Sequence, residues 1–400
     1  MSGVIYNPLA DGFIERAYEV YATLRREDPL HRTALGSYMV TRYADVRASL
    51  SHPGARNIDL SDTPRMQAGH GGEFHTLKKT LKTFLILING GEHLRLRKHF
   101  SRLMDAQVVA TAMASFQQTL HARSELLARA DCMDLQVDFA VPVATSFTMG
   151  LMGFPPRDSI WVAKMVRSLA RVIDTFVSIN EYAEIEHDIE SMADYIEEII
   201  EQKRIQPDGS LISKAVALLD ELPQEEHTGI ICNLILVALA SSATMTDTIG
   251  TTSLALLNHK DQLSGLSDSP QGMGRAADEL IRYYSPVEII NRYAFEDIEL
   301  DSGVIPQGSL YCCVLGSANR DESVFENAGN LDLSRPKNPH LGFAFGPHTC
   351  LGKHAAKYEL IATLGVLSQH MPDFGLTTDR VEWRQSSVFR GLEHLRVVRL

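Results

Sequence analysis

The chain has 400 residues, of which 44% are hydrophobic, so it is long enough to bury a substantial core. Its 38 lysines and arginines are outnumbered by 50 aspartates and glutamates, which gives a net charge of −12. Proteins that bind nucleic acids are more often basic, so this balance argues against that class.

The first half of the chain predicts mainly helices. Apolar spacing near 3.6 residues predicts a helix over 12–27, and alternation predicts a strand over 36–42. Residues 54–82 show weak periodicity, and we expect a mobile loop there. Helical patterns then dominate residues 92–263, including a charged amphipathic helix at 182–204.

Residues 222–260 predict one helix of more than thirty residues, and its stretch 229–245 carries no charge. That stretch is at the short limit of a membrane-spanning helix. Its polar residues, with Glu226 and Asp247 on either side, favour a buried central helix of a soluble protein instead.

After residue 285, short β-like runs are separated by Gly and Pro, and the final segment 384–400 predicts a pair of strands. Repeats and Gly/Ser linkers are absent from the sequence. We therefore predict a single domain over residues 1–400, mainly α with a small β lobe.

The five cysteines, at 132, 232, 312, 313 and 350, are an odd number, and no pair has zinc-ribbon spacing. This usage favours a reducing, cytoplasmic location. The N-terminal segment lacks a basic region followed by an apolar run, so we predict no signal peptide.

One cysteine stands out by its surroundings, "GFAFGPHTCLGK" at 342–353. Gly346 and Gly352 flank Cys350 and permit a tight loop, and a helix is predicted to follow. A lone cysteine is usually a small buried hydrophobe. A thiolate just before a helix is, however, stabilised by the helix N-terminus.

Three uses of such a thiolate can be compared. A nucleophile needs a base, and His348, two residues away, has no evident reason to meet Cys350 within a tight loop. Zinc needs three or four ligands, and no second cysteine is close in sequence. Haem iron needs only one protein thiolate, because the porphyrin supplies the other ligands in its plane.

The pattern Phe343-x-x-Gly346-x-x-x-Cys350-x-Gly352 resembles the haem-ligand signature of cytochrome P450 at every fixed position. One neighbour departs, because Ala344 stands where that family usually has glycine. The resemblance implies a cytochrome P450 fold with a long central helix across the haem. It also implies haem b as cofactor, Cys350 as the thiolate ligand of the iron, and contacts to the haem from Phe343, Gly352 and His348.

Other segments are consistent with this resemblance. Glu279 and Arg282 share a helix face at i, i+3. The family adds a second arginine, matched by Arg335, which implies a structural ion-pair network. His93 and Arg97, at i, i+4, form either a solvated basic face or a clamp for one anion. The resemblance favours a clamp for the haem propionates, joined by Arg292.

The central helix of the family usually carries A-G-x-[D/E]-T, and the matching stretch here runs from Ala240 through Ser241, Ser242 and Ala243 to Thr244. The resemblance implies that Ala240 lies on the haem and that Thr244 is catalytic. The usual acid is replaced by Ala243. We expect protons to travel instead through water, Ser241, Ser242 or the substrate, and we expect Asp247 to have a packing or solvent role.

The missing acid leaves alternatives open. "ASSATM" is similar to the A-G-N-A-T-M helix of fungal nitric oxide reductases, which take electrons directly from a nicotinamide. Only a basic run at 77–82 points to such access, so ordinary oxidation is favoured over NO chemistry. Oxidative coupling, nitration and a non-catalytic haem protein are further alternatives.

The resemblance also places five segments, 83–89, 172–180, 236–244, 287–291 and 387–389, over the haem. An apolar pocket with a few polar groups, here Asn291 and Glu288, is typical of small-molecule sites. For each side chain, core packing is the alternative. The predicted pocket residues are Phe84, Ile86, Leu239, Val287, Ile290, Asn291, Val388 and Phe389.

Flavin and iron–sulfur domains are absent from the sequence, so the resemblance implies an external ferredoxin and ferredoxin reductase. We predict a basic docking patch for an acidic ferredoxin, made of Lys353, Arg95, Lys98 and Arg102. The expected substrate is a small organic molecule, free or bound to a carrier protein. Neither a nucleic acid nor a membrane is expected as a partner.

Overall fold

The computed structural model describes residues 6–8, 10–62, 74–174, 177–266, 269–378 and 380–400. Their contacts divide the chain into two compact units. Unit 1 comprises Met1–Ile58, Ala130–Gln136 and Asp247–Leu400, and unit 2 comprises Asp59–Arg129 and Val137–Thr246. The single domain remains a prediction.

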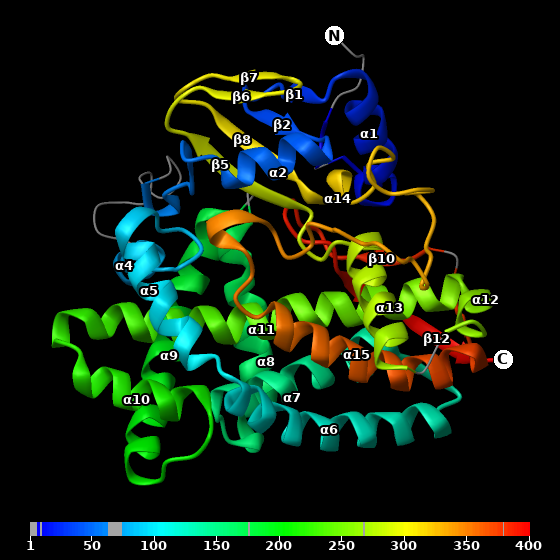
Figure 1. Ribbon diagram of the computed structural model, residues 1–400. Helices are drawn as coiled ribbons and strands as arrows, with labels where there is room; N and C mark the ends of the chain where they lie inside the picture. The colour runs from blue at the N-terminus through cyan, green and yellow to red at the C-terminus, as the bar shows by residue number, and fades with distance from the viewer. Residues whose placement is uncertain (1–5, 9, 63–73, 175–176, 267–268, 379) are drawn as a thin grey trace. The chain divides into compact units, whose positions relative to one another are not determined.

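Unit 1 contains every strand in the described part of the chain. Its largest sheet has five strands in the order β1-β2-β8-β5-β3, visible in Figure 1. Strands β2 and β8 are parallel, whereas the other neighbours in this sheet are antiparallel. The members are β1 (Leu30–Arg32), β2 (Tyr38–Val40), β3 (Ala55–Arg56), β5 (Ile289–Ala294) and β8 (Leu310–Val314).

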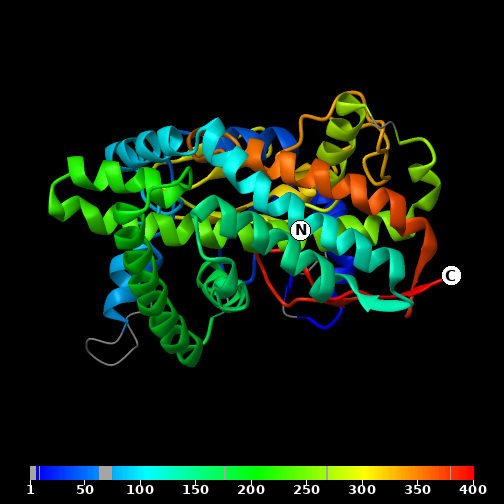
Figure 2. The same cartoon turned by 90° about the horizontal axis from the view of Figure 1, so that it is seen from below.

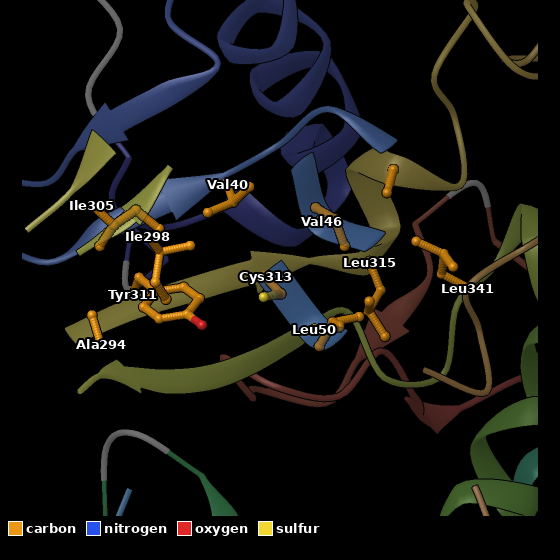
Figure 3. Packing of buried hydrophobic residues seen from close by; sticks show 11 residues of the cluster. Val40, Val46, Leu50, Ala294, Ile298, Ile305, Tyr311, Cys313, Leu315 and Leu341 are labelled. Carbon is orange, nitrogen blue, oxygen red and sulfur yellow. The ribbon is translucent and has the colours of Figure 1, made fainter. Parts of the chain in front are cut away.

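Helix α2 (Tyr43–Ser51) packs on this sheet through one apolar face. Val46 and Leu50, four residues apart and therefore on the same side, point toward Cys313 and Leu315, as Figure 3 shows. Cys313 is fully buried while its neighbour Cys312 is half-buried, as side chains that alternate along a strand require. The helices α1 (Phe13–Glu27) and α14 (Leu315–Ala318) complete this lobe.

The segment 384–400 contains two strands, as predicted, but they do not pair with each other. β11 (Leu392–His394) pairs with β10 (Glu382–Trp383), whereas β12 (Arg396–Arg399) lies between β4 (Cys132–Asp134) and β9 (Phe374–Leu376). The two strands therefore belong to different sheets. A separate hairpin joins β6 (Ile298–Leu300) and β7 (Gly303–Ile305).

Unit 2 is helical where it is described. Its helices α6 and α7 lie side by side in Figure 1, and close contact is possible because Gly150 has no side chain. A Cβ at Gly150 would lie 2.9 Å from the Cα of Ala112. The helices are α4 (His75–Leu81), α5 (Gly90–Leu103), α6 (Ala106–Arg129), α7 (Val141–Met152), α8 (Ser159–Ala170), α9 (Ile179–Ile205) and α10 (Leu211–Glu221).

Helix α11 (Gln224–Asn258) is 35 residues long and contributes to both units. It is drawn as one uninterrupted helix in Figures 1 and 2, which confirms the prediction of a single helix of more than thirty residues. Leu135–Met152 and Gln224–Asn258 are both long and apolar enough to span a membrane, yet 67% and 56% of their most apolar windows are buried. Burial of this kind is typical of core helices.

The predicted loop over 54–82 is wrong in part. Residues 63–73 lie outside the described residues, but α4 is a helix. Leu77 and Leu81 are buried on one face of α4. The carboxylate of Glu186, on α9, accepts the backbone N–H groups of Thr76 and Leu77. A side chain that is distant in sequence therefore caps a helix that the local sequence does not predict.

Candidate active site

The loop that carries Cys350 is closed by its own backbone. The Ala344 N–H donates to the Leu341 carbonyl at 2.8 Å, and the Cys350 N–H donates to the Phe343 carbonyl at 2.9 Å. Cys350 is exposed at its tip, just before helix α15 (Lys353–His370). The N-terminal amides of α15 favour a negative charge on a group placed there.

Two residues of the loop have left-handed backbone conformations. Gly346 has φ of +79°, and a Cβ there would lie 2.8 Å from the carbonyl oxygen of Leu50, so only glycine fits. Ala344 has φ of +58°, a region that side chains disfavour. The departure from the family's usual glycine is thus made at a position where glycine would be less strained.

Both sides of the loop are fixed to other parts of unit 1. The guanidinium of Arg47 lies 4.2 Å from the ring centre of Phe345. An imidazole nitrogen of His348 lies 3.0 Å from the side-chain nitrogen of Asn57. These contacts attach the loop to α2 and to the residues that follow β3.

Helix α13 (Pro270–Tyr283) contains a buried charge network. Glu279 and Arg282 are both fully buried, and Arg282 donates to both oxygens of Glu279 at 2.7 Å. Arg335 donates to the same carboxylate at 2.9 Å. Further donation from Arg282 to the carbonyls of Asn319 and Ala328 joins the helix to the segment that precedes the cysteine loop. This geometry has a structural rather than a chemical use.

Arg292, on β5, has the burial and the lack of a carboxylate partner that are expected of a residue that binds an anion. It is only 6% exposed, yet no carboxylate among the described residues pairs with it, and its guanidinium donates only to the Asn291 carbonyl. Burial lowers the pKa of Arg292. A buried cation without a counterion fits the propionate of a bound haem.

In unit 2, His93 and Arg97 lie one turn apart on α5. Burial, followed by the nearby positive charge of Arg97, lowers the pKa of His93. The neutral imidazole is therefore favoured at neutral pH, and it can donate one N–H to an anion. The binding of propionates by these two residues remains a prediction.

On α11, the Thr244 hydroxyl donates to the Ala240 carbonyl at 2.7 Å. Ala240 is exposed although most of its neighbours on the helix are buried, so a small-residue strip of α11 is open. This strip offers a flat surface that a planar group could cover. Of the two predicted proton carriers, Ser242 is buried, and Ser241 bonds the hydroxyl of Thr148, on α7, at 2.8 Å. Their catalytic roles remain predictions.

Asp247 has the packing role that we expected. Its carboxylate is 1% exposed and accepts two bonds from Arg384, at 2.9 and 2.6 Å. Its partner Arg384 was not predicted, because the two residues lie 137 positions apart.

The predicted pocket residues differ in exposure. Phe84, Leu239 and Val388 are buried, whereas Ile86 is 38% exposed. Val287 and Phe389 form a β-bridge, and the Asn291 side-chain oxygen accepts from Cys312 at 3.1 Å. Within the predicted segment 172–180, residues 175–176 lie outside the described residues.

Glu288 uses only one of its carboxylate oxygens within the chain: Oε1 accepts from Tyr18 at 2.6 Å and from Arg390 at 2.9 Å. Its other oxygen is buried and has no hydrogen-bond partner among the described residues, so a role in orienting a ligand stays a prediction. The sequence also gave no sign of Glu359, on α15, which is fully buried.

Comparison with known proteins agrees with this geometry. The family model for cytochrome P450 matches residues 275–371. The biotin biosynthesis cytochrome P450 of Bacillus subtilis (strain 168) is 30% identical over 391 residues, which cover 96% of this chain and 96% of that protein. The polyketide biosynthesis cytochrome P450 PksS of the same organism is 28% identical over 414 residues, covering 99% of each chain.

Among solved structures, P450BioI in complex with hexadec-9Z-enoic acid ligated acyl carrier protein is similar, with a TM-score of 0.87 and 28% identity. The match covers 98% of this chain and 100% of that chain.

The chain therefore belongs to the cytochrome P450 family, with the mainly helical fold and small β lobe predicted from the sequence. It is an oxidoreductase of the monooxygenase type, and its cofactor is haem b. When bound, the haem supplies the oxidising chemistry, and the residues described above can only hold, orient and shield it.

Proposed function

We propose that this chain holds haem through the Cys350 thiolate and oxidises a small organic molecule in specialised metabolism, by hydroxylation or a related oxidation. The observation that carries the proposal is the exposed Cys350 in a self-closed loop directly before α15. The buried guanidinium of Arg292, which has no carboxylate partner among the described residues, supports propionate binding by Arg292. We propose that His348, His93 and Arg97 bind the propionates with it.

Optical spectroscopy tests the ligand. The reduced, carbon-monoxide-treated protein is expected to show the red-shifted Soret band typical of thiolate ligation, and Cys350→Ser is expected to abolish it. Cys232→Ser, at a buried cysteine of unit 2, is the matched control and should keep the band. Retention of the band in Cys350→Ser would overturn the proposal.

The substrate is proposed to arrive on an acyl carrier protein. Support comes from the solved relative, which was crystallised with a fatty acid attached to such a carrier. The test compares free hexadec-9Z-enoic acid with the same acid linked to an acyl carrier protein, by the spin-state shift of the ferric haem. A shift at lower concentration with the linked form supports the proposal, and equal or absent shifts contradict it.

Electrons are proposed to come from a ferredoxin and its reductase in the cytoplasm. No disulfide joins any of the five cysteines, which is consistent with a reducing compartment. The test is reduction of the haem by a reconstituted ferredoxin and its reductase. Failure of these two proteins to reduce the haem would contradict the proposed source of electrons.

A second candidate, NO-directed chemistry, is favoured only by Ala243 at the position of the usual acid. NADH-driven consumption of NO without a protein partner would select it over ordinary oxidation. Turnover that requires the ferredoxin would exclude it.

A further inference from the structure

The segment 384–391 carries an arginine at its start and another one residue before its end, and each is bound to a buried carboxylate of unit 1. At its start, Arg384 donates through both terminal nitrogens to the two oxygens of Asp247, at 2.9 and 2.6 Å. A fork of this kind fixes the direction of approach as well as the distance. Asp247 belongs to α11, so the start of the segment is tied to the helix one turn beyond Thr244.

At its end, the Nε of Arg390 donates to Glu288 at 2.9 Å, and their side chains are only 3% and 7% exposed. The same carboxylate oxygen accepts the Tyr18 hydroxyl at 2.6 Å. The Arg390 guanidinium lies 4.3 Å from the ring centre of Tyr18 and 4.7 Å from that of Trp383. The ion pair with Glu288 and the two aromatic rings together surround this arginine.

Backbone bonds close the segment between these anchors. The Arg384 N–H donates to the Gly391 carbonyl at 2.9 Å, and the Glu288 N–H donates to the Val388 carbonyl at 2.8 Å. Gly391 is required, because a Cβ there would lie 2.0 Å from an oxygen of Asp247. Between the anchors, the Ser386 hydroxyl accepts the N–H of Phe389 at 2.9 Å.

Stability alone is a weak reason for two such pairs. A buried ion pair is often no more stable than apolar residues of the same volume, because both charges lose their hydration. An apolar replacement cannot supply the directional geometry of a hydrogen-bonded ion pair. Each pair therefore sets the position of one end of the segment.

We propose that Asp247–Arg384 and Glu288–Arg390 are positioning pairs that hold segment 384–391 in one shape, so that Val388 and Phe389 determine which ligands the substrate pocket accepts. This rests on the proposed function and on the prediction, from the family resemblance, that 387–389 lines the substrate pocket. It assigns Asp247 to holding the segment rather than to moving protons.

The test uses four conservative variants, Asp247→Asn, Arg384→Lys, Glu288→Gln and Arg390→Lys. Imidazole and 4-phenylimidazole are titrated against the ferric protein, and the ratio of their dissociation constants is read from the haem spectrum. We expect the ratio to change by about tenfold, the scale of a methylene group misplaced in an apolar pocket. Arg25→Lys is the matched control, because Arg25 is 6% exposed and pairs with Glu322 at 2.8 Å, in the same unit. It should leave the ratio unchanged.

Thermal midpoints are measured alongside, because a purely structural role would lower them without moving the ratio. An unchanged ratio in all four variants, within about twofold, overturns the proposal. If a variant does not take up haem, hydrogen exchange of 384–391 in the remaining variants decides, and protection equal to that of the unsubstituted protein counts against the proposal. Failure of the proposed function is distinct, since it appears as loss of the thiolate Soret band before any substitution.

Discussion

Ala344 has an energetically unfavourable backbone conformation within the cysteine loop. Its φ of +58° lies in the left-handed region, which costs an ordinary residue roughly 1–2 kcal/mol. Glycine removes that cost but gains flexibility in the unfolded chain. We expect Ala344→Gly to stabilise the protein by about 1 kcal/mol in urea unfolding.

The control for this substitution is Ala356→Gly, within α15, where glycine should instead destabilise by about 1 kcal/mol. Equal losses in both variants would show that the backbone at 344 is not strained.

Glu359 is a buried acid that should make stability depend on pH. It is 0% exposed, and neither carboxylate oxygen has a hydrogen-bond partner among the described residues. Burial raises the pKa of Glu359 well above its usual value. At neutral pH the folded protein therefore holds a proton there that the unfolded chain has released.

Because the folded state binds more protons, stability should fall as pH rises above the unfolded pKa of about 4.3, by up to about 1.4 kcal/mol per pH unit. Glu359→Gln removes this titration. Its advantage in the free energy of unfolding should grow from pH 5 to pH 8 and vanish near pH 4, while the exposed Glu125→Gln should show no such trend. A pH-independent difference at 359 would contradict the protonated state.

At the scale of elements, Asn233 connects α11 to the turn after α4. Its side-chain nitrogen donates to the Thr83 carbonyl at 2.8 Å, and its oxygen accepts the Leu85 N–H at 2.7 Å. Asn233 is 1% exposed, so water cannot replace these bonds. The amide therefore holds the start of segment 83–89, which is predicted to line the pocket.

Asn233→Ala should lower the free energy of unfolding by about 1–3 kcal/mol, because it leaves the buried Leu85 N–H without its partner and removes one bond to the half-buried Thr83 carbonyl. It should also speed hydrogen exchange at the Leu85 amide. Val237→Ala, on the same helix, should destabilise without that local change. Normal protection of the Leu85 amide in Asn233→Ala would show that the turn is held by other contacts.

Elements with strong local patterns were predictable, and those set by distant contacts were not. Helices α1 and α11 follow from apolar spacing within their own residues. By contrast, α4 depends on a carboxylate more than a hundred positions away, at Glu186. Strand β12 takes its partners from β4 and β9, so the pattern of 384–400 alone could not give its pairing.

The candidate site likewise has parts that local sequence predicts and parts that depend on distant contacts. The cysteine loop was predictable because its glycines and Cys350 lie within ten residues of one another. The ion pair of Glu288 was not predictable because its partner, Arg390, lies 102 residues further along the chain. Pairing of this kind is visible only in three dimensions.

At the scale of the whole molecule, a net charge of −12 sets how an acidic partner can approach. Such a partner is repelled on average and must be guided by local positive charge. In unit 2, Lys98 and Arg102 are exposed on α5, whereas Arg95 already pairs with Glu226. Lys98 and Arg102 should therefore contribute most of unit 2's share of the predicted docking patch.

Lys98→Glu with Arg102→Glu should slow the second-order rate of haem reduction by reduced ferredoxin by about tenfold at low salt. Since salt screens exposed charges over ~8 Å at physiological strength, the difference should shrink as salt is added. The spectrum of the haem should not change. Arg129→Glu, an exposed site on α6, supplies a control of the same sign and should have little effect. If the double variant is reduced as fast as the unsubstituted protein in stopped-flow measurements at low salt, ferredoxin approaches elsewhere.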